Sequence, residues 1–249
     1  MRIIDINCMI GAWPSRQSHY KEIDDLFLDM DRYRLSDCIA FHSMALWSPE
    51  RGNLLIKQMS ENSSGRIKPC YILEPNLGSS EMPCADELYI QLKEEKPVAV
   101  RLYPNLKQFR VDDFYCGELL DVLSELEMPV IFEADQTPGF DYLPVLAKAY
   151  PRIKIIILRH GFRESRYIIP MLKKINNVYF DTSIMVDTGI IEEIVNEYGS
   201  EKLLFGSGLP SFPPTGAISL ILYARIKNED MGNILFKNWL RIEDGIQCK

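Results

Sequence analysis

The chain has 249 residues, of which 47% are hydrophobic and 25% are charged, with a net charge of −7 and an isoelectric point near 5.1. This length and composition predict one globular domain, residues 1–249, with enough apolar material for a large core. The acidic balance argues against a nucleic-acid partner, which would need clustered Lys and Arg, and favours a small-molecule ligand.

Cysteine spacing and hydropathy indicate the compartment. The six cysteines contain no CxxC pair, so the sequence suggests neither a zinc knuckle nor a disulfide framework. The first residues read as a strand rather than a signal peptide, and no apolar run approaches the roughly 20 residues that cross a bilayer. We therefore expect a cytoplasmic protein with no membrane partner, and leave a homo-oligomer open.

Eight short apolar runs recur along the chain, separated by segments in which apolar residues have helical spacing. The runs are Ile3–Ile6, Cys38–Phe41, Lys68–Leu73, Val98–Leu102, Val130–Phe132, Ile155–Leu158, Val178–Phe180 and Leu203–Phe205. They are near-continuous rather than alternating, which is typical of parallel strands buried on both faces. Eight such units in about 250 residues predict a single (β/α)8 barrel, the TIM-barrel fold.

The segments between the runs carry helix signals. One helix is predicted from an apolar face with spacing i, i+3, i+4 and i+7, formed by Ile23, Leu26, Phe27 and Met30. Asp112 suits a helix N-terminus and Gly199 a helix C-cap. A doubly wound open sheet is the alternative architecture, but it usually has a glycine-rich phosphate loop after its first strand, and no GxGxxG motif follows Ile3–Ile6.

Polar residues stand at or just after the ends of the predicted strands, where a parallel barrel opens its ligand-binding mouth. They are Asn7, Arg101, Tyr103, Glu133, Asp135, Arg159, His160, Asp181 and Ser207. Arginine suits carboxylate recognition because its planar fork of donors matches two oxygens. We expect the two arginines either to neutralise Glu133 and Asp135 or to bind an anionic ligand.

Several of these strand ends resemble the amidohydrolase-related family of metal-dependent hydrolases and decarboxylases. The stretch Gly206-Ser207-Gly208-Leu209-Pro210 resembles the last barrel strand of that family, which reads GSD or GTD followed by Pro. The segment 4–11 resembles its opening IDxHxHxG, segment 155–161 its strand ending in HxG, and segment 129–135 its strand ending in a metal-binding His. The resemblance implies the (β/α)8 fold and a role for His160 in polarising substrate or transferring a proton.

This sequence departs from the family pattern at the four positions that bind metal. Asn7 and Met9 replace two His, Glu133 replaces a third, and Gly208 replaces the Asp. Asn offers only a neutral carbonyl and Met a soft thioether, so neither is a good ligand for zinc. We expect no resident metal cofactor. The alternative is a weakly held divalent ion on Glu133, Asp135 and His160.

Two functions follow from the resemblance and its departures. One is a hydrolase-like or lyase-like protein acting on or binding a small carboxylate-containing molecule, without the usual zinc. Glu133 and His160 would then be catalytic, and the substrate would be bound by Asn7, Arg101, Tyr103, Asp135, Arg159, Asp181 and Ser207. The other is a non-catalytic ligand-binding or regulatory barrel, and fold alone cannot choose between the two.

Overall fold

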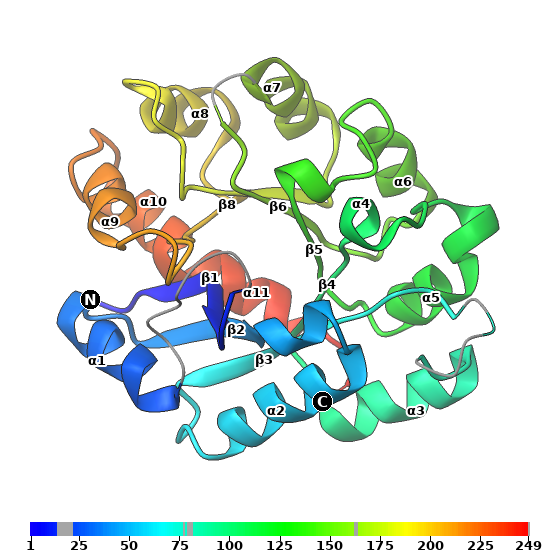
Figure 1. Ribbon diagram of the computed structural model, residues 1–249. Helices are drawn as coiled ribbons and strands as arrows, with labels where there is room; N and C mark the ends of the chain where they lie inside the picture. Colours follow the sequence, from blue (N-terminus) through cyan, green and yellow to red (C-terminus); the bar gives the residue numbers. More distant parts are fainter. Residues whose placement is uncertain (14–21, 77, 79–81, 162–163, 249) are drawn as a thin grey trace.

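A computed structural model of the chain describes residues 1–13, 22–76, 78, 82–161 and 164–248. Eight parallel strands form one sheet in which neighbours follow chain order, as Figure 1 shows. The strands are β1 (Ile4–Ile10), β2 (Asp37–His42), β3 (Ile67–Ile72), β4 (Ala99–Arg101), β5 (Val130–Glu133), β6 (Ile155–Leu158), β7 (Val178–Asp181) and β8 (Leu203–Leu204). All eight predicted strands are confirmed, each within a few residues.

Hydrogen bonds between β1 and the chain at and after β8 close the sheet. The Ile6 N–H donates to the Phe205 carbonyl at 3.0 Å, and the Met9 N–H donates to the Leu209 carbonyl at 3.0 Å. In return the Gly208 N–H donates to the Asn7 carbonyl at 3.1 Å. The sheet is therefore a (β/α)8 barrel, and the open-sheet alternative is wrong.

Helices ring the barrel on its outer side (Figure 1). The α-helices are α1 (Ile23–Tyr33), α2 (Pro49–Glu61), α3 (Ala85–Glu95), α4 (Pro104–Lys107), α5 (Asp113–Glu125), α6 (Leu143–Ala149), α7 (Ser165–Lys174), α8 (Ile190–Tyr198), α9 (Thr215–Leu222), α10 (Asn228–Gly232) and α11 (Asn238–Asp244). Shorter turns are the 3-10 helices η1 (Ser43–Leu46) and η2 (Ala134–Gln136) and the π-helix η4 (Asn233–Lys237). Within the described ranges, no helix is long and apolar enough to cross a membrane.

The predicted helix boundaries have clear physical causes. Asp112 is the N-cap of α5, and its side chain accepts a hydrogen bond from the Tyr115 N–H at 3.0 Å. Gly199 ends α8 with a φ of 83°, a conformation that favours glycine. In α1 the predicted apolar face is the buried one, with Leu26 and Met30 each 0% exposed.

Side chains alternate between two apolar cores along each strand. In β6, Ile155 and Ile157 face the helix layer, whereas Ile156 and Leu158 belong to the cluster inside the barrel. Trp239 of α11 joins that inner cluster and is 1% exposed. An ion pair of 2.6 Å between Lys68 and Glu243 ties α11 to the beginning of β3, so α11 covers the N-terminal end of the barrel. The opposite end is left for the mouth.

Candidate functional site

Arg101, the last residue of β4, lies at the centre of the polar groups in the mouth. Its side chain is 1% exposed and its Nη2 donates to Asn7 Oδ1 at 3.1 Å. The Phe41 ring supports the guanidinium, with 4.6 Å from Cζ to the ring centroid. Nε and Nη1 make no hydrogen bond within the part of the chain that the structure describes. Buried donors without acceptors are unfavourable, so a ligand oxygen at these atoms would be stabilising.

Glu133, at the end of β5, is held by three side chains. Tyr103 Oη donates to Glu133 Oε1 at 3.1 Å, and Arg159 Nη1 donates to Glu133 Oε2 at 3.0 Å. Arg101 Nη1 lies 3.6 Å from Oε1 as an ion pair. Of the two carboxylates that the sequence offered to the arginines, both arginines therefore pair with Glu133, and neither forms an ion pair with Asp135 among the described residues. Two arginines against one carboxylate leave one positive charge in the mouth.

Arg159 also connects Glu133 to the loop after β8. Its guanidinium lies over the Phe212 ring, 5.3 Å from the centroid, and its side chain is 40% exposed. The residue has a φ of 56°, and its backbone N–H donates to Asp181 Oδ1 at 2.9 Å. The strand end at β6 thus contributes a cation to the mouth and a backbone donor to β7.

Asp181, the last residue of β7, is completely buried with one oxygen unpaired. Oδ2 makes no hydrogen bond among the described residues, although the Ser183 hydroxyl lies nearby. A Cβ at Gly206 would come within 2.5 Å of that oxygen and 3.2 Å of the Asn7 Cβ. Gly206 is therefore glycine because Asp181 and Asn7 converge on it. Burial raises the pKa of Asp181 to about 7.

His160 lies behind Asp181 rather than beside Glu133. Its Nε2 is 2.9 Å from the backbone carbonyl oxygen of Asp181, so the ring donates there and Nε2 carries the proton. The ring is 2% exposed and meets the edge of Phe180, with 5.4 Å between centroids. It lines a small cavity between α7 and α8 together with Met185 and Ile190. Burial lowers the pKa of His160 to about 4, so the ring is neutral at neutral pH.

Ser207 is fixed by Asp5, a residue that the sequence reasoning did not include in the site. The Ser207 backbone N–H donates to Asp5 Oδ1 at 2.9 Å and its hydroxyl bonds Asp5 Oδ2. The Asn7 N–H donates to the same Asp5 Oδ1 at 3.0 Å. Burial raises the pKa of Asp5. The match of Asp5 to the opening motif was the signal that could have identified this junction of β1 with the β8 loop.

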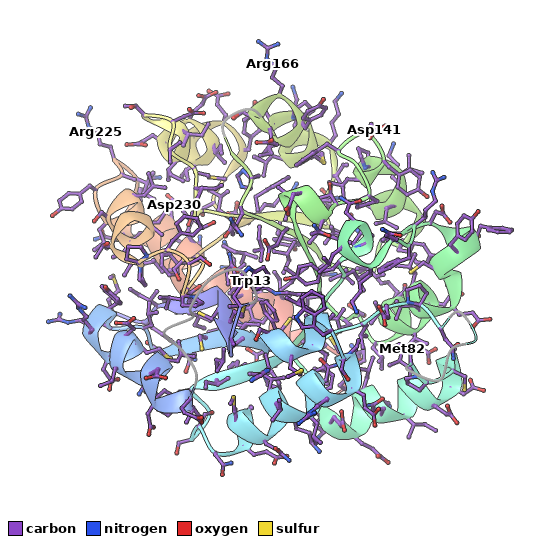
Figure 2. The ribbon with its side chains drawn as sticks, viewed as in Figure 1. Trp13, Met82, Asp141, Arg166, Arg225 and Asp230 are labelled. Carbon is purple, nitrogen blue, oxygen red and sulfur yellow. The ribbon has the colours of Figure 1, made fainter. Side chains whose placement is uncertain are left out.

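Most of the predicted site residues belong to one chain of contacts. The path runs from Asn7 to Arg101, Glu133 and Arg159 and then to Asp181. Asp135 is the exception, because it is exposed in η2, where its carbonyl accepts from Asn105. Trp13 packs on the inner cluster near the centre of the barrel opening (Figure 2). The site is therefore an arginine-centred polar mouth with an aromatic rim.

The residues at the four family metal positions do not fit a divalent ion. Asn7 Oδ1 accepts from Arg101, and Glu133 is bound by Arg101, Tyr103 and Arg159, so the one carboxylate is already paired with cations. Met9 packs in the apolar inner cluster. In the described part of the chain, no three His, Cys, Asp or Glu residues lie close enough to hold a metal. A guanidinium in the centre would also repel a second cation.

The sequence of this chain matches the profile of a known protein family. The profile of the Amidohydrolase family matches residues 76–231, which is more than half of the chain. The chain belongs to the Amidohydrolase family. No curated protein matches it by sequence. The membership agrees with the resemblance at the strand ends and with the barrel fold.

Three solved structures share the whole fold of this chain at low sequence identity. The 5-carboxyvanillate decarboxylase LigW of Sphingomonas paucimobilis has a TM-score of 0.76 at 12% identity, covering 98% of this chain and 99% of that one. The 4-oxalomesaconate hydratase LigJ of Rhodopseudomonas palustris has 0.71 at 18%, covering 98% and 96%. A probable 2-pyrone-4,6-dicarboxylic acid hydrolase of Acinetobacter baumannii, with citric acid bound, has 0.68 at 16%, covering 98% and 100%.

Two of these three names share one chemical feature. Two are named for reactions on carboxylate-containing compounds, decarboxylation and hydrolysis, and the third for hydration of oxalomesaconate. The Acinetobacter structure contains a bound carboxylic acid. At these identities the structural likeness establishes the fold of this amidohydrolase-family barrel, while its own ligand has to be argued from its own mouth.

Proposed function

We propose that this amidohydrolase-family barrel binds a small carboxylate-containing molecule at its C-terminal mouth and acts on it as a hydrolase or lyase without the usual catalytic zinc. Arg101 would bind the carboxylate, with Asn7 beside it and Arg159 at the entrance. The net charge of the Arg101, Arg159 and Glu133 group is positive, which attracts an anion. The carboxylate-containing substrates and ligand named for the similar structures support this class of ligand.

The observation that carries the proposal is the position of the Arg101 guanidinium. It contacts the residues at two of the four family metal positions, Asn7 and Glu133, and is itself almost completely buried. Its Nε and Nη1 make no hydrogen bond among the described residues, so each has an N–H that could donate to a ligand oxygen. A side-chain cation would thus supply the positive charge where relatives are expected to use a metal.

The chemistry within reach of such a mouth is limited to activated substrates. Without a Lewis acid no water is acidified, so a carboxylate would have to act as the base while Arg101 stabilises a developing oxyanion. Glu133 is the candidate base, with Tyr103, Asp181 and Ser207 positioning the substrate. His160, which was expected to be catalytic, would instead act indirectly, by holding the Asp181 carbonyl from the helix layer. Lactones and similar activated carboxyl compounds are the substrates that this arrangement suits.

A second candidate is a non-catalytic ligand-binding barrel, and two contacts favour it. Both oxygens of Glu133 accept hydrogen bonds, from Tyr103 and from Arg159, so neither oxygen is free to take a proton from a water or a substrate. His160 is buried against the Asp181 carbonyl with a lowered pKa. Incubation with lactones and aromatic carboxylates, followed by mass spectrometry, separates the two. Turnover abolished by Glu133→Gln indicates the enzyme, whereas binding without any product indicates the binding barrel.

Thermal-shift screening tests the carboxylate site itself. We expect carboxylates such as benzoate and citrate to raise Tm, and the uncharged benzamide to leave it unchanged. Arg101→Ala should abolish the shift and Arg159→Ala should reduce it. The control is Arg152→Ala, which removes a surface arginine paired with Glu127 and should respond to carboxylates as the unmodified protein does. A response that ignores ligand charge, or that survives Arg101→Ala, would refute the proposal.

A further inference from the structure

The unpaired oxygen of Asp181 is the least explained polar atom in the mouth. Asp181 follows the inward-facing Tyr179 by two residues on β7, so its side chain points into the barrel. Oδ1 accepts from the Arg159 N–H, whereas Oδ2 makes no hydrogen bond in the described chain, although the Ser183 hydroxyl lies near the carboxylate. The neighbouring Asn7 Nδ2 is also buried and unpaired. Asp181 Oδ2 lies against Gly206 and Asn7 Nδ2 against Gly208, so two buried polar atoms without partners flank the segment after β8 and indicate a place for a polar ligand atom.

The charges around Asp181 come from several elements. Burial and Asp5 on β1 oppose a charge on Asp181, while the Ser183 hydroxyl, the Arg159 backbone N–H just after β6 and Arg101 on β4 favour it. His160 faces it only as a neutral ring on its carbonyl. If Asp181 is ionised, its charge cancels the one positive charge left by the two arginines and Glu133. A ligand carboxylate would then enter a mouth with no net attraction and with a like charge beside it.

We propose that carboxylate binding at this mouth is coupled to the uptake of one proton by Asp181, whose Oδ2–H then donates a hydrogen bond to the ligand. The inference rests on the proposed function, since it concerns the same mouth. The proton comes from solvent and bonds to Oδ2, and no other bond is made or broken. A protonated Asp181 removes the like-charge repulsion and gives the orphaned oxygen an acceptor.

The free protein is poised for this step. The pKa of Asp181 is raised to about 7 by burial, so the carboxyl group is mostly ionised at pH about 8 and can take up a proton there. A nearby ligand anion raises that pKa further. Because only the protonated form is competent, the apparent affinity should fall about tenfold for each unit of pH above 7.

Calorimetry with benzoate tests the coupling directly. Benzoate has a single ionisable group, which titrates near the usual carboxyl range of about 4, so any proton taken up at higher pH goes to the protein. Titrations at pH about 8 in phosphate and in Tris, which differ in ionisation enthalpy, give the number of protons per bound benzoate. We expect close to one proton at pH about 8 and close to none at pH about 5.5, where Asp181 already carries it.

Two substitutions test whether Asp181 is the residue that takes up the proton. Asp181→Asn keeps the acceptor for the Arg159 N–H and should bind benzoate with no proton uptake and with an affinity independent of pH, about tenfold tighter than the unmodified protein at pH about 8. Asp141→Asn is the matched control, since Asp141 is exposed at the periphery (Figure 2). The Asp141→Asn protein should take up one proton on binding benzoate, as the unmodified protein does.

The outcomes separate this inference from the function on which it rests. Benzoate binding to the unmodified protein without proton uptake at pH about 8, or uptake that persists in Asp181→Asn, overturns the inference alone. No binding of benzoate at any pH overturns the carboxylate site and the coupling together. If Asp181→Asn does not fold, carbon-13 NMR of aspartate-labelled unmodified protein decides. One carboxyl resonance should titrate near pH 7 and move to higher pH with benzoate, and its absence contradicts the coupling.

Discussion

At the scale of single residues, the arrangement of the mouth depends on the hydrogen-bond and ion-pair partners of each charged side chain. Arg101 is buried, cannot lose its proton, and therefore needs acceptors at all times. Asn7 and Glu133 supply some of them, and the remaining donors are left for a ligand. The amide oxygen of Asn7 accepts a hydrogen bond from Arg101, and the histidine expected at this position in the family has no such oxygen. Asn7 and Glu133 stand at two of the family's metal-binding positions, and here their amide and carboxylate oxygens serve as acceptors for Arg101.

Gly208, at the position of the family Asp, has a conformational reason to lack a side chain. Its φ is 83°, and a Cβ there would lie 3.0 Å from Cδ2 of Phe212. We expect Gly208→Ala to lower the free energy of unfolding by about 2 kcal/mol, from left-handed strain and from displacement of Phe212. Gly65→Ala is the matched control, because Gly65 has a φ of 81° with nothing within 4 Å, and should lose about 1 kcal/mol. Equal losses in urea denaturation would show that Phe212 does not constrain position 208.

At the scale of elements, the strands were predictable and their side-chain partners were not. Near-continuous apolar runs separated by segments with helical spacing identified all eight strands, but the first was predicted to end at Ile6 and continues to Ile10. The apolar criterion stops at Asn7, whereas the register continues, with Cys8 beside Ala40 and Met9 beside Phe41, after an irregularity in the pairing. Pairing depends on main-chain hydrogen bonds, which apolar patterning does not report.

The parts of the site differ in how far sequence could predict them. Position at a strand end was enough to bring Arg101, Arg159 and Glu133 together, because parallel strands end on one side. It was not enough to place His160, since the chain turns at Arg159 with a positive φ and carries the next side chain into the helix layer. Nor could it show that Asp5 joins β1 to the β8 loop, because that contact spans 202 residues.

The burial of His160 between α7 and α8 should make the free energy of unfolding depend on pH. The pKa of this histidine is about 4 in the folded chain and about 6.5 unfolded, so between these values only the unfolded chain binds the proton. Its contribution to stability is complete above pH about 6.5 and is lost as pH falls towards 4, by up to about 3 kcal/mol. The raised pKa of Asp181 acts in the opposite direction, with stability lost as pH rises from about 4 to about 7.

Comparison with His160→Gln isolates the histidine, since the Asp181 contribution is common to both proteins and the glutamine amide can still donate to the Asp181 carbonyl. We expect the unmodified protein to lose stability relative to His160→Gln as pH falls from 7 to about 4.5, measured by urea unfolding. A difference that stays constant over this range would mean that the ring is hydrated and titrates normally.

At the scale of the whole molecule, the barrel divides its two ends between structure and function. The N-terminal end is filled by Trp239 and tied by the Lys68–Glu243 ion pair. The C-terminal end holds the buried charged side chains Arg101 and Asp181, and each has polar atoms that make no hydrogen bond in the described chain and could bind a ligand. The chain has a net charge of −7, so the locally positive mouth is a feature of these few side chains and not of the molecule.

Elemental analysis of the protein, purified without added metal, is the most direct test of an arginine-centred, zinc-free mouth. Structural zinc sites with full ligand sets bind with roughly 10 to 16 kcal/mol, and replacement of several ligands leaves little of that affinity. We predict well under one equivalent of zinc, manganese or iron per chain, unchanged by Gly208→Asp alone. Near-stoichiometric metal that is removed by a chelator together with an activity would contradict the account.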